Sequence, residues 1–345
     1  MSTTPNAAGK RPSVLVITVS YKTAKLVENS LRALARERPR SNVDIFAYVI
    51  DNASGDAPHL RDAIDKNGWG DWATLHASTK NGGFSYGNNR GFEHAYQTGN
   101  VPDYFMLLNP DAEVEAGAID ELVKFLEAHP RAAVAGSQLI FQDGTPWPYA
   151  FRFLNLLGEL QTALATGVAA KVLDRWITTR RMGNNPERVD WLPGAAMLIR
   201  RSAIDAVGGL DESYFLYFEE LDFFIKLDRA GYETWYVPAS RVMHISGQSS
   251  GITARDRKGP MPEYWFESRR RYFAKTYGVP YAMLTDAVCI PAYVLGRLKK
   301  QLVGRGNENI PGFTLSLLKH SALLNPLREV LPPVEYRKPR SSGLP

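Results

Sequence analysis

The stretch Asp-Tyr-Phe-Met-Leu-Leu-Asn-Pro-Asp-Ala-Glu at residues 103–113 decides the fold. Its apolar run, 104–108, predicts a buried strand. The Asn109-Pro110 turn then delivers the carboxylate of Asp111 directly after that strand. Oxygen ligands at the carboxyl end of a buried strand suit a divalent metal that holds a diphosphate, although Asn-Pro-Asp is also an ordinary turn sequence.

Patterns typical of strands and helices alternate on both sides of this stretch. The expected strands are 14–19, 43–50, 73–77 and 104–108, and the expected helices are 24–37, 57–66, 85–97 and 116–128. Continuous β-branched runs suit strands that are buried on both faces, and apolar residues at helical spacing suit helices that cover a sheet. The order predicts an α/β fold with a doubly wound, mostly parallel sheet and right-handed connections.

Beyond residue 130 the pattern breaks into shorter pieces. Strands are expected at 134–141, 195–199 and 234–237, and a helix at 219–230. Residues 144–188, rich in Pro, Trp and Arg, predict a flap over a site. From about residue 255 the chain becomes helical and basic. We therefore expect a disordered tail at 1–12, a catalytic domain at 13–254, a basic helical extension at 255–330 and a disordered tail at 331–345.

The composition is that of a globular protein. The 345 residues can bury a full core, and 44% of them are hydrophobic. The single cysteine, Cys289, excludes an internal disulfide framework and a multi-cysteine zinc site, and it favours a reducing cytosol. Residues 1–12 are polar and lack the apolar middle of a secretory signal. We expect a cytoplasmic protein.

The net charge of +5 is unevenly distributed. Residues 251–345 carry 16 Lys and Arg against 7 Asp and Glu, whereas the rest of the chain carries 25 against 29. A basic segment on a slightly acidic body predicts an anionic partner. The chain has neither an interleaved aromatic and basic RNA motif nor a recognisable DNA-binding module, so no nucleic-acid partner is expected. A membrane surface or a lipid diphosphate fits the charge pattern.

An apolar run, Ala287–Gly296, lies within the basic segment and contains Pro291. It is too short to span a bilayer. Two interpretations stay open. The run is either an in-plane anchor that makes peripheral contact with the cytoplasmic face of the inner membrane, or part of a helical subdomain or dimer contact.

Asp51 follows the strand that ends at Ile50. An acid at the carboxyl edge of a parallel sheet can accept hydrogen bonds from a ribose or from a base N–H. The structural alternative is that Asp51 opens an Asx turn through Asn52. The sequence favours neither of these two interpretations.

A glycine-rich loop at residues 81–91 reads Asn-Gly-Gly-Phe-Ser-Tyr-Gly-Asn-Asn-Arg-Gly. Gly82 and Gly83 let the backbone approach a ligand closely, and Ser85 is expected to cap a helix whose N-terminus attracts phosphate. Asn88 adds a polar group on that helix. The spacing is neither a Walker loop nor the dinucleotide fingerprint. A glycine-rich loop before a capped helix is the structural alternative.

The densest cluster lies at residues 208–222, where an aromatic-rich loop runs into Glu219 and Glu220. Acids are favoured in a first helical turn by the helix dipole alone. The preceding aromatics, however, are expected to draw the pair into a dry environment, where a carboxylate can serve as a general base.

His244 ends a strand and enters a small polar loop. A single histidine is more often structural than a ligand. A metal held by Asp111 needs further protein ligands, and neutral imidazole is a good one.

Together these segments resemble glycosyltransferase family 2, and within it the bacterial rhamnosyltransferase-like members, over roughly residues 13–250. The matching pieces are 18–21, 49–54, 81–91, 107–111, 194–197, 208–222 and 244–249. The resemblance implies an A-type glycosyltransferase fold with a C-terminal helical extension. Each piece is a weak motif alone, but their order and spacing together are specific.

The resemblance also implies roles for individual residues. Asp51 would read the nucleotide base, and the nucleotide-sugar site would further include Ser20, Tyr21, Asn81, Gly82, Gly83, Asn88, Asn109 and Asp111. Asn109 and Asp111 occupy the ends of the family's Asp-x-Asp motif, so Asp111 would hold the metal, with His244 beside it. Glu220 aligns best with the catalytic base, Glu219 is the alternative, and Gly194 and Asp222 would lie at the acceptor and flap side.

The family implies an inverting, in-line transfer that depends on Mg²⁺ or Mn²⁺. The expected donor is dTDP-rhamnose, with UDP-hexoses next, and the expected acceptor is a glycan or a lipid-diphosphate-linked sugar in cell-surface polysaccharide synthesis. Two alternatives remain: a nucleotidyltransferase, and a non-catalytic module that binds sugar nucleotides. The first strand is followed by Ser20-Tyr21-Lys22 rather than by the glycine-rich loop that a nucleotidyltransferase usually has.

Overall fold

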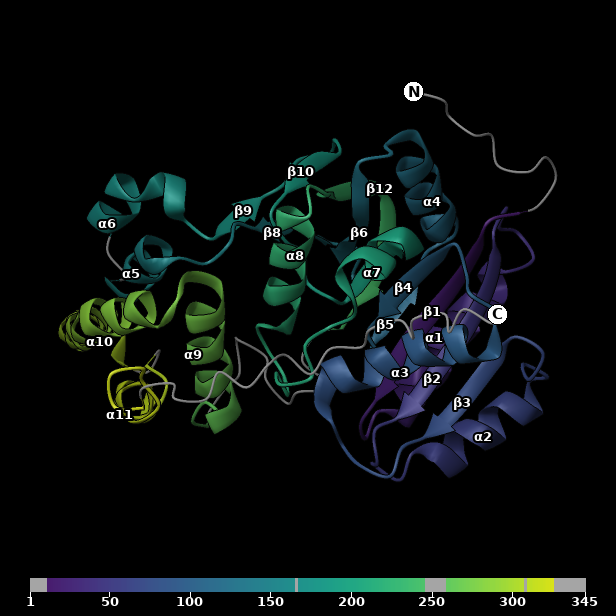
Figure 1. Ribbon diagram of the computed structural model, residues 1–345, viewed down its shortest axis with the longest axis horizontal. Coiled ribbons are helices and arrows are strands. Elements are labelled where there is room, and N and C mark those ends of the chain that lie inside the picture. The colour runs from purple at the N-terminus through teal and green to yellow at the C-terminus, as the bar shows by residue number, and fades with distance from the viewer. Residues whose placement is uncertain (1–10, 165–166, 246–258, 307–308, 326–345) are drawn as a thin grey trace, which may run out of the picture.

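Figure 1 shows a computed structural model of the chain, which describes residues 11–164, 167–245, 259–306 and 309–325. In this part of the chain, ten strands form one mixed sheet. Its main path runs β10-β12-β6-β11-β4-β1-β2-β3, with β5 beside β12 and β7 beside β6. The sheet is mostly parallel and helices pack on it, so the predicted fold class is confirmed.

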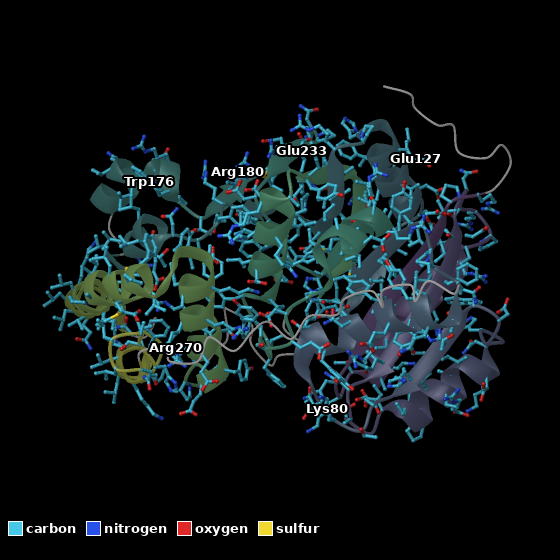
Figure 2. All side chains as sticks on the ribbon, in the orientation of Figure 1. Lys80, Glu127, Trp176, Arg180, Glu233 and Arg270 are labelled. Atoms are coloured by element: carbon cyan, nitrogen blue, oxygen red, sulfur yellow. The ribbon has the colours of Figure 1, made fainter. Side chains whose placement is uncertain are left out.

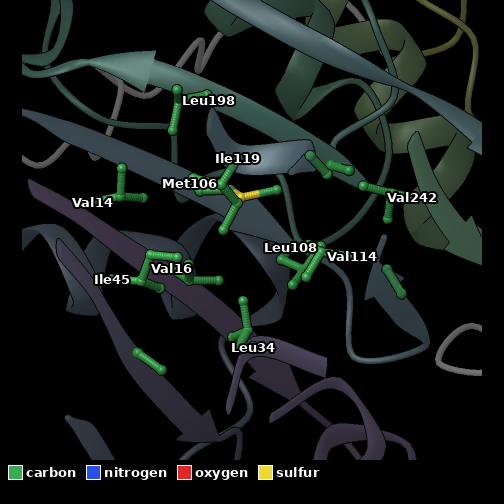
Figure 3. Packing of buried hydrophobic residues seen from close by; sticks show 14 of the residues in the cluster. Val14, Val16, Leu34, Ile45, Met106, Leu108, Val114, Ile119, Leu198 and Val242 are labelled. Carbon is green, nitrogen blue, oxygen red and sulfur yellow. The ribbon is translucent and has the colours of Figure 1, made fainter. Parts of the chain in front are cut away.

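The N-terminal half follows the predicted order closely. Its elements are β1 (Ser13–Ser20), α1 (Ala24–Glu37), β2 (Asp44–Asp51), α2 (Ala57–Lys66), β3 (Ala73–Ala77), α3 (Gly83–Thr98) and β4 (Tyr104–Leu108). Strands β4, β1, β2 and β3 are parallel neighbours, so their carboxyl ends share one edge. One apolar core lies between the sheet and α1, α2 and α4 (Ala118–Ala128); Figure 3 shows part of it.

The C-terminal half of the sheet is built from β5 (Ala112–Val114), β6 (Ala132–Ile140), β7 (Pro146–Trp147), β10 (Glu187–Val189), β11 (Ala196–Arg200) and β12 (Glu233–His244). Strand β11 is antiparallel to both β4 and β6, which makes the sheet mixed. Strand β12 is far longer than the predicted 234–237. Its pairing with β6 shifts between Val237 and Arg241, and after this irregularity it continues to His244.

The predicted flap consists of small elements: β8 (Tyr149–Phe151), α5 (Leu156–Leu164), α6 (Gly167–Val172), a 3₁₀ turn at Asp174–Trp176 and β9 (Thr179–Arg181). Strands β8 and β9 form a separate two-stranded sheet. Helix α5 packs against the C-terminal helix α10 (Val279–Leu302), and Gly296 is required there because a Cβ would collide with the carbonyl of Ala163. A flap over the site stays a prediction.

The C-terminal region contains α9 (Glu263–Tyr277), α10 and α11 (Phe313–Lys319), as the predicted helical extension requires. In Figure 2, Arg270 and Trp176 lie at this helical end of the molecule, whereas Lys80 and Glu127 lie at the sheet end. The buried guanidinium of Arg269 pairs with Glu159 at 2.7 Å and with Asp286 at 2.6 Å, which ties α9 to α5 and α10.

The structure does not test the predicted division into domains. The tails and the boundary between residues 254 and 255 fall largely outside the described ranges, and the division into domains stays a prediction. The expectation for the apolar run 287–296 was wrong in length. This run is the middle of a 24-residue helix that continues through Pro291 and is long and apolar enough to cross a bilayer by length and composition alone.

Candidate active site

The antiparallel pairing of β4 and β11 brings distant segments together at the carboxyl edge of the sheet. Leu108, the last residue of β4, is opposite Ala196, the first residue of β11. One step further, the N–H of Asn109 donates to the carbonyl of Ala195 at 2.9 Å. The Asn-Pro-Asp turn is therefore fixed against the segment that begins β11.

Strand β12 delivers His244 to the same turn. His244 is paired with Ala112, directly after Asp111. Its Nε2 lies 3.2 Å from Asp111 Oδ1 and 3.3 Å from Asn109 Nδ2. Asp111 is only 3% exposed. The three side chains that the sequence assigned to the metal and diphosphate thus converge.

The donor set of Asp111 and His244 fits a divalent cation. Around an octahedral Mg²⁺ the ligands lie at about 2.0–2.1 Å, so neighbouring ligand atoms are about 3 Å apart. The separation of Asp111 Oδ1 and His244 Nε2, 3.2 Å, matches this value. In the described residues no group of three or more His, Cys, Asp and Glu could hold a metal. A cation here would therefore need oxygens from a diphosphate or from water, which is how Mg²⁺ is usually held.

The two candidate bases begin α8 (Glu219–Arg229). The two residues before the helix, Tyr217 and Phe218, have positive φ angles of 70° and 67°. Residues other than glycine rarely adopt this left-handed backbone conformation, and such strain is concentrated at functional sites. The sharp turn lets the chain leave the aromatic loop and start a helix with two carboxylates in its first turn.

Glu220 is bound to the segment that begins β11. The N–H of Gly194 donates to Glu220 Oε1 at 2.5 Å. Gly194 has no room for a side chain, since a Cβ would collide with Glu220 Oε1 and approach Phe84 to 3.0 Å. Residues 194–195 therefore contact Glu220 on one side and Asn109 on the other, so the base and metal candidates lie on either side of one short segment.

The two carboxylates differ in their electrostatics. Burial raises the pKa of Glu220 to about 7, and the hydrogen bond from Gly194 opposes this rise. Burial, and then the charge of Glu220, raises the pKa of Glu219 well above its usual range. Glu219 is 2% exposed, and its Oε2 has no hydrogen-bond partner. The raised pKa of Glu219 favours its protonated form, and a pKa of about 7 lets Glu220 exchange a proton near neutral pH.

The glycine-rich loop joins this site through the aromatic loop. The N–H of Phe84 donates to the carbonyl of Phe215 at 3.0 Å, and a Cβ on Gly83 would collide with that carbonyl. Asn81 Oδ1 accepts from the N–H of Gly83 at 3.1 Å. Gly83 is thus needed for a close approach, although what it approaches is the protein's own backbone.

One prediction for this loop was wrong. Helix α3 begins at Gly83 and not at 85, and Ser85 lies fully buried inside the first turn with no hydrogen-bond partner for its Oγ. Ser85 therefore does not cap the helix. The side chain of Asn88 is also turned inward, and its Nδ2 donates to the carbonyl of Phe84 at 2.9 Å.

Other predicted nucleotide contacts are held by local hydrogen bonds. Asp51 Oδ1 accepts from both the N–H and the hydroxyl of Ser54, and its Oδ2 accepts from the N–H of Ala57. The Asx-turn alternative accounts for these contacts, and base reading by Asp51 stays a prediction. The hydroxyl of Ser20, also buried, donates to Asp56 at 2.8 Å, while Tyr21 is half-buried beside it. Gly82 donates its N–H to Asn52 Oδ1 at 3.3 Å.

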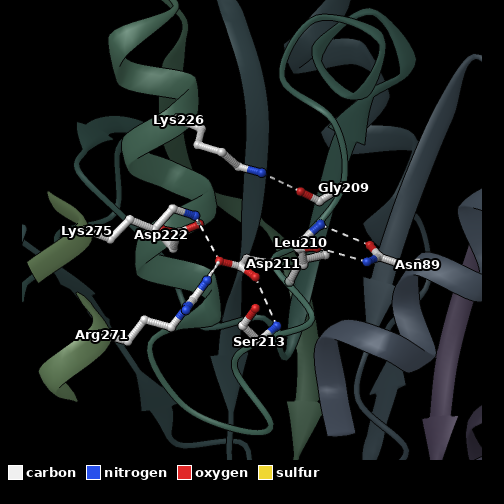
Figure 4. A network of polar contacts seen from close by, with 9 residues as sticks. All are labelled: Asn89, Gly209, Leu210, Asp211, Ser213, Asp222, Lys226, Arg271 and Lys275. Atoms are coloured by element: carbon white, nitrogen blue, oxygen red, sulfur yellow. Dashed lines mark hydrogen bonds and ion pairs between the residues drawn. The ribbon is translucent and has the colours of Figure 1, made fainter. Parts of the chain in front are cut away.

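Asp222 lies in an ionic network that sequence reasoning missed (Figure 4). Lys275 Nζ of α9 is 2.8 Å from Asp222 Oδ2 and 3.0 Å from Asp211 Oδ2. Arg271 is also paired with Asp211, at 2.9 Å. These contacts attach α9 to α8 behind Glu220. No local pattern could reveal them, because Lys275 lies more than fifty residues from both acids.

Solved structures with a similar fold place the protein in a class. The crystal structure of GalNAc-T7 with UDP, GalNAc and Mn²⁺ matches 85% of this chain and 55% of that chain, with 15% identity and a TM-score of 0.54. The mannosyltransferase PcManGT from Pyrobaculum calidifontis, in complex with GDP-Man and Mn²⁺, matches 92% and 82%, with 16% identity and a TM-score of 0.50. The fold is that of the A-type glycosyltransferases.

The family follows from the sequence. The model of the family described as glycosyltransferase like family 2 matches residues 12–259, and the chain belongs to this family. The N-acetylglucosaminyl-diphospho-decaprenol L-rhamnosyltransferase of Mycobacterium tuberculosis is 33% identical over 152 residues, which are 44% of this chain and 50% of that protein.

Rhamnosyltransferase WbbL of Escherichia coli is 27% identical over 172 residues, which are 48% of this chain and 62% of that protein. The low-salt glycan biosynthesis hexosyltransferase Agl10 of Haloferax volcanii is 26% identical over 217 residues, 60% of this chain and 59% of that protein. The chain thus spans about half the length of the first of these relatives. The resemblance to the rhamnosyltransferase-like members is confirmed.

Proposed function

We propose that this protein is an inverting glycosyltransferase of cell-surface polysaccharide synthesis. It moves a sugar from a nucleoside diphosphate to a hydroxyl of a glycan or of a lipid-diphosphate-linked acceptor. The observation that carries the proposal is Glu220, a half-buried carboxylate with a pKa near 7 that is fixed by Gly194 beside the Asn-Pro-Asp turn. The family and the rhamnosyltransferase relatives support the same activity.

Glu220 is the general base in this proposal. Its ionised carboxylate takes the proton of the acceptor hydroxyl as the hydroxyl oxygen forms a bond to the anomeric carbon. The bond between that carbon and the diphosphate oxygen breaks on the opposite face, and the nucleoside diphosphate leaves with the electron pair. Glu219 is the weaker candidate for this role, because burial and the charge of Glu220 favour its protonated form.

Asp111 and His244 would hold a divalent metal, Mg²⁺ or Mn²⁺, together with the donor diphosphate. When bound, such a cation neutralises negative charge on the departing diphosphate. Asn109 lies beside both residues and would orient the same diphosphate. The two structural neighbours, which contain Mn²⁺ and a nucleotide or nucleotide sugar, support this assignment at the level of the fold.

The donor that we favour is dTDP-rhamnose, followed by a UDP-hexose. Two relatives named as rhamnosyltransferases support the first, and the relative named as a hexosyltransferase keeps the second open. The acceptor and its linkage stay open. A lipid-linked acceptor would place the reaction at the cytoplasmic face of the membrane.

The function is tested by incubating the full-length protein with a radiolabelled sugar nucleotide, Mg²⁺ or Mn²⁺, and membrane lipids as the source of acceptor. Release of the nucleoside diphosphate together with labelled lipid or glycan supports the proposal. Release of pyrophosphate would identify a nucleotidyltransferase, and tight donor binding without turnover on any acceptor would identify a binding module. Either of these two results contradicts the proposal.

A further inference from the structure

Helix α10 reverses the pattern of an ordinary amphipathic helix. The side chains that it buries against the protein are small or polar: Ala282, Thr285, Asp286, Cys289, Ala292 and Gly296. Among the side chains that it exposes, six are larger and apolar: Leu284, Pro291, Val294, Leu295, Leu298 and Leu302. We call this second set the α10 outer face. A helix of a water-soluble domain normally has the opposite pattern.

The α10 outer face is a continuous stripe. Together with the exposed Ala287, its residues follow helical spacing at 284, 287, 291, 294 and 295, 298 and 302, so they lie on one side. Leu295 is 60% exposed, Leu298 50% and Leu302 88%. The region that follows adds further exposed leucines: Leu315, Leu318, Leu323 and Leu324. Contiguous exposed apolar surface of this kind marks a site of association with a membrane or a partner.

The charges near the α10 outer face favour a membrane over a protein partner. Residues 287–306 contain four basic residues and no Asp or Glu. The basic residues, Arg297, Lys299, Lys300 and Arg305, all lie at the C-terminal end of α10 or just after it. An apolar stripe beside a cluster of cations suits an anionic bilayer, where the leucines enter the acyl region and the cations lie among the phosphates.

The packing of α10 also determines its orientation. The inner face contacts α5, α9 and α11, and Asp286 on that face is paired with the buried Arg269. If α10 spanned the bilayer, these helices and their ion pairs would enter the hydrocarbon, which is costly. An orientation in the plane of the membrane buries only the outer face.

We propose that the α10 outer face is a docking surface on which the protein lies in the plane of an anionic membrane. The inference does not depend on glycosyl transfer, because it is based on the shape and charge of α10 alone. If the proposed function also holds, docking would concentrate the enzyme at the surface where a lipid-linked acceptor is found.

Vesicle flotation with the full-length protein tests the proposal. Wild-type protein is expected to float with vesicles of phosphatidylglycerol and phosphatidylethanolamine and to float poorly with phosphatidylcholine alone. The variant Leu295→Glu/Leu298→Glu is expected to bind the anionic vesicles about 100-fold more weakly, since two leucines that would enter the bilayer are replaced by charges. Phe46→Glu is the matched control, because Phe46 is an exposed apolar residue on β2, far from α10 in Figure 1, and should leave binding unchanged.

The remaining outcomes are equally decisive. Equal flotation of wild type and the double-leucine variant, or no flotation of the wild type, overturns the proposal. Resistance of bound protein to extraction by alkaline carbonate indicates a spanning helix and overturns the in-plane orientation. A dimer in light scattering that the leucine variant abolishes assigns the face to a second copy. Unchanged circular dichroism of the variant would show that it folds.

Discussion

Two groups of carboxylates in this protein differ in whether a cation is paired with them. In the helical region, Glu159 and Asp286 both contact the guanidinium of Arg269. At the start of α8, no cation from the described part of the chain is paired with Glu219 or Glu220, and burial raises the pKa of both. Buried charge without a partner is destabilising, so it is expected where the chemistry requires it. The paired group holds helices together, and the unpaired group is available for proton transfer.

The largest expected effect is on the unpaired group. Glu220→Gln keeps the size and the hydrogen bond from Gly194 but cannot accept a proton, so transfer should fall by about 10²–10⁴-fold. Donor binding, measured by calorimetry with the intact sugar nucleotide, should be retained, because the proposed diphosphate contacts are those of Asp111 and His244. Near-normal turnover by this variant would remove Glu220 as the base.

The paired group should respond through stability. Arg269→Met leaves Glu159 and Asp286 buried without their cation, which should cost about 3–5 kcal/mol of unfolding free energy. This cost corresponds to a fall in Tm of roughly 10 °C. The fall should be smaller at pH 5 than at pH 8, since burial favours the protonated form of Glu159. Lys66→Met breaks the exposed pair with Asp62 and is the control, with a much smaller change in Tm. Equal effects of the two variants would contradict the comparison.

Disturbing the contact between Gly194 and Glu220 should have an effect of intermediate size. Gly194→Ala places a Cβ on Glu220 Oε1 and should displace the carboxylate, which lowers the transfer rate by about 10²-fold. Gly70→Ala, where a Cβ meets nothing within 4 Å, is the matched control and should leave the rate unchanged. Steady-state assays of both variants at saturating donor measure the difference. An unaffected Gly194→Ala would show that the position of Glu220 is unimportant.

Glu219 should give the smallest effect. Its pKa is raised in the folded protein, so the folded state retains a proton that the unfolded chain releases above about pH 4.5. The stability of the wild type is therefore expected to fall as the pH rises above that value. Glu219→Gln removes this loss and should raise Tm by about 2 °C or more at pH 8, with little change at pH 4. A lower Tm of the variant at pH 8 would show that Glu219 is ionised in the folded protein.

The sequence predicted the N-terminal half of the fold better than the C-terminal half. Helices 24–37 and 57–66 and strands 73–77 and 104–108 were predicted with the bounds that the structure has. Here the apolar periodicity is set by a sheet that is covered on both faces. Beyond residue 130 two elements were underestimated. The sequence pattern of β12 is broken by an irregularity after Val237, and Pro291 suggested an interruption in α10, where it lies on the exposed face.

The sequence named the candidate site residues but not the contacts between them. The pairing of His244 with Asp111 and the approach of Gly194 to Glu220 depend on how β11 and β12 enter the sheet, which no local pattern specifies. The network of Asp211, Asp222 and Lys275 was missed for the same reason. The sequence also could not distinguish Glu219 from Glu220, because the difference arises from burial in the folded protein.

The pH dependence of the transfer rate tests the central claim most directly. With donor and acceptor saturating, kcat should rise about tenfold per pH unit below pH 7 and become constant above it, as a base with a pKa of about 7 must lose its proton to act. The residual rate of Glu220→Gln should lack this inflection. A wild-type profile that is flat from pH 5 to 9, or an inflection that persists in Glu220→Gln, would contradict the assignment of Glu220 as the base.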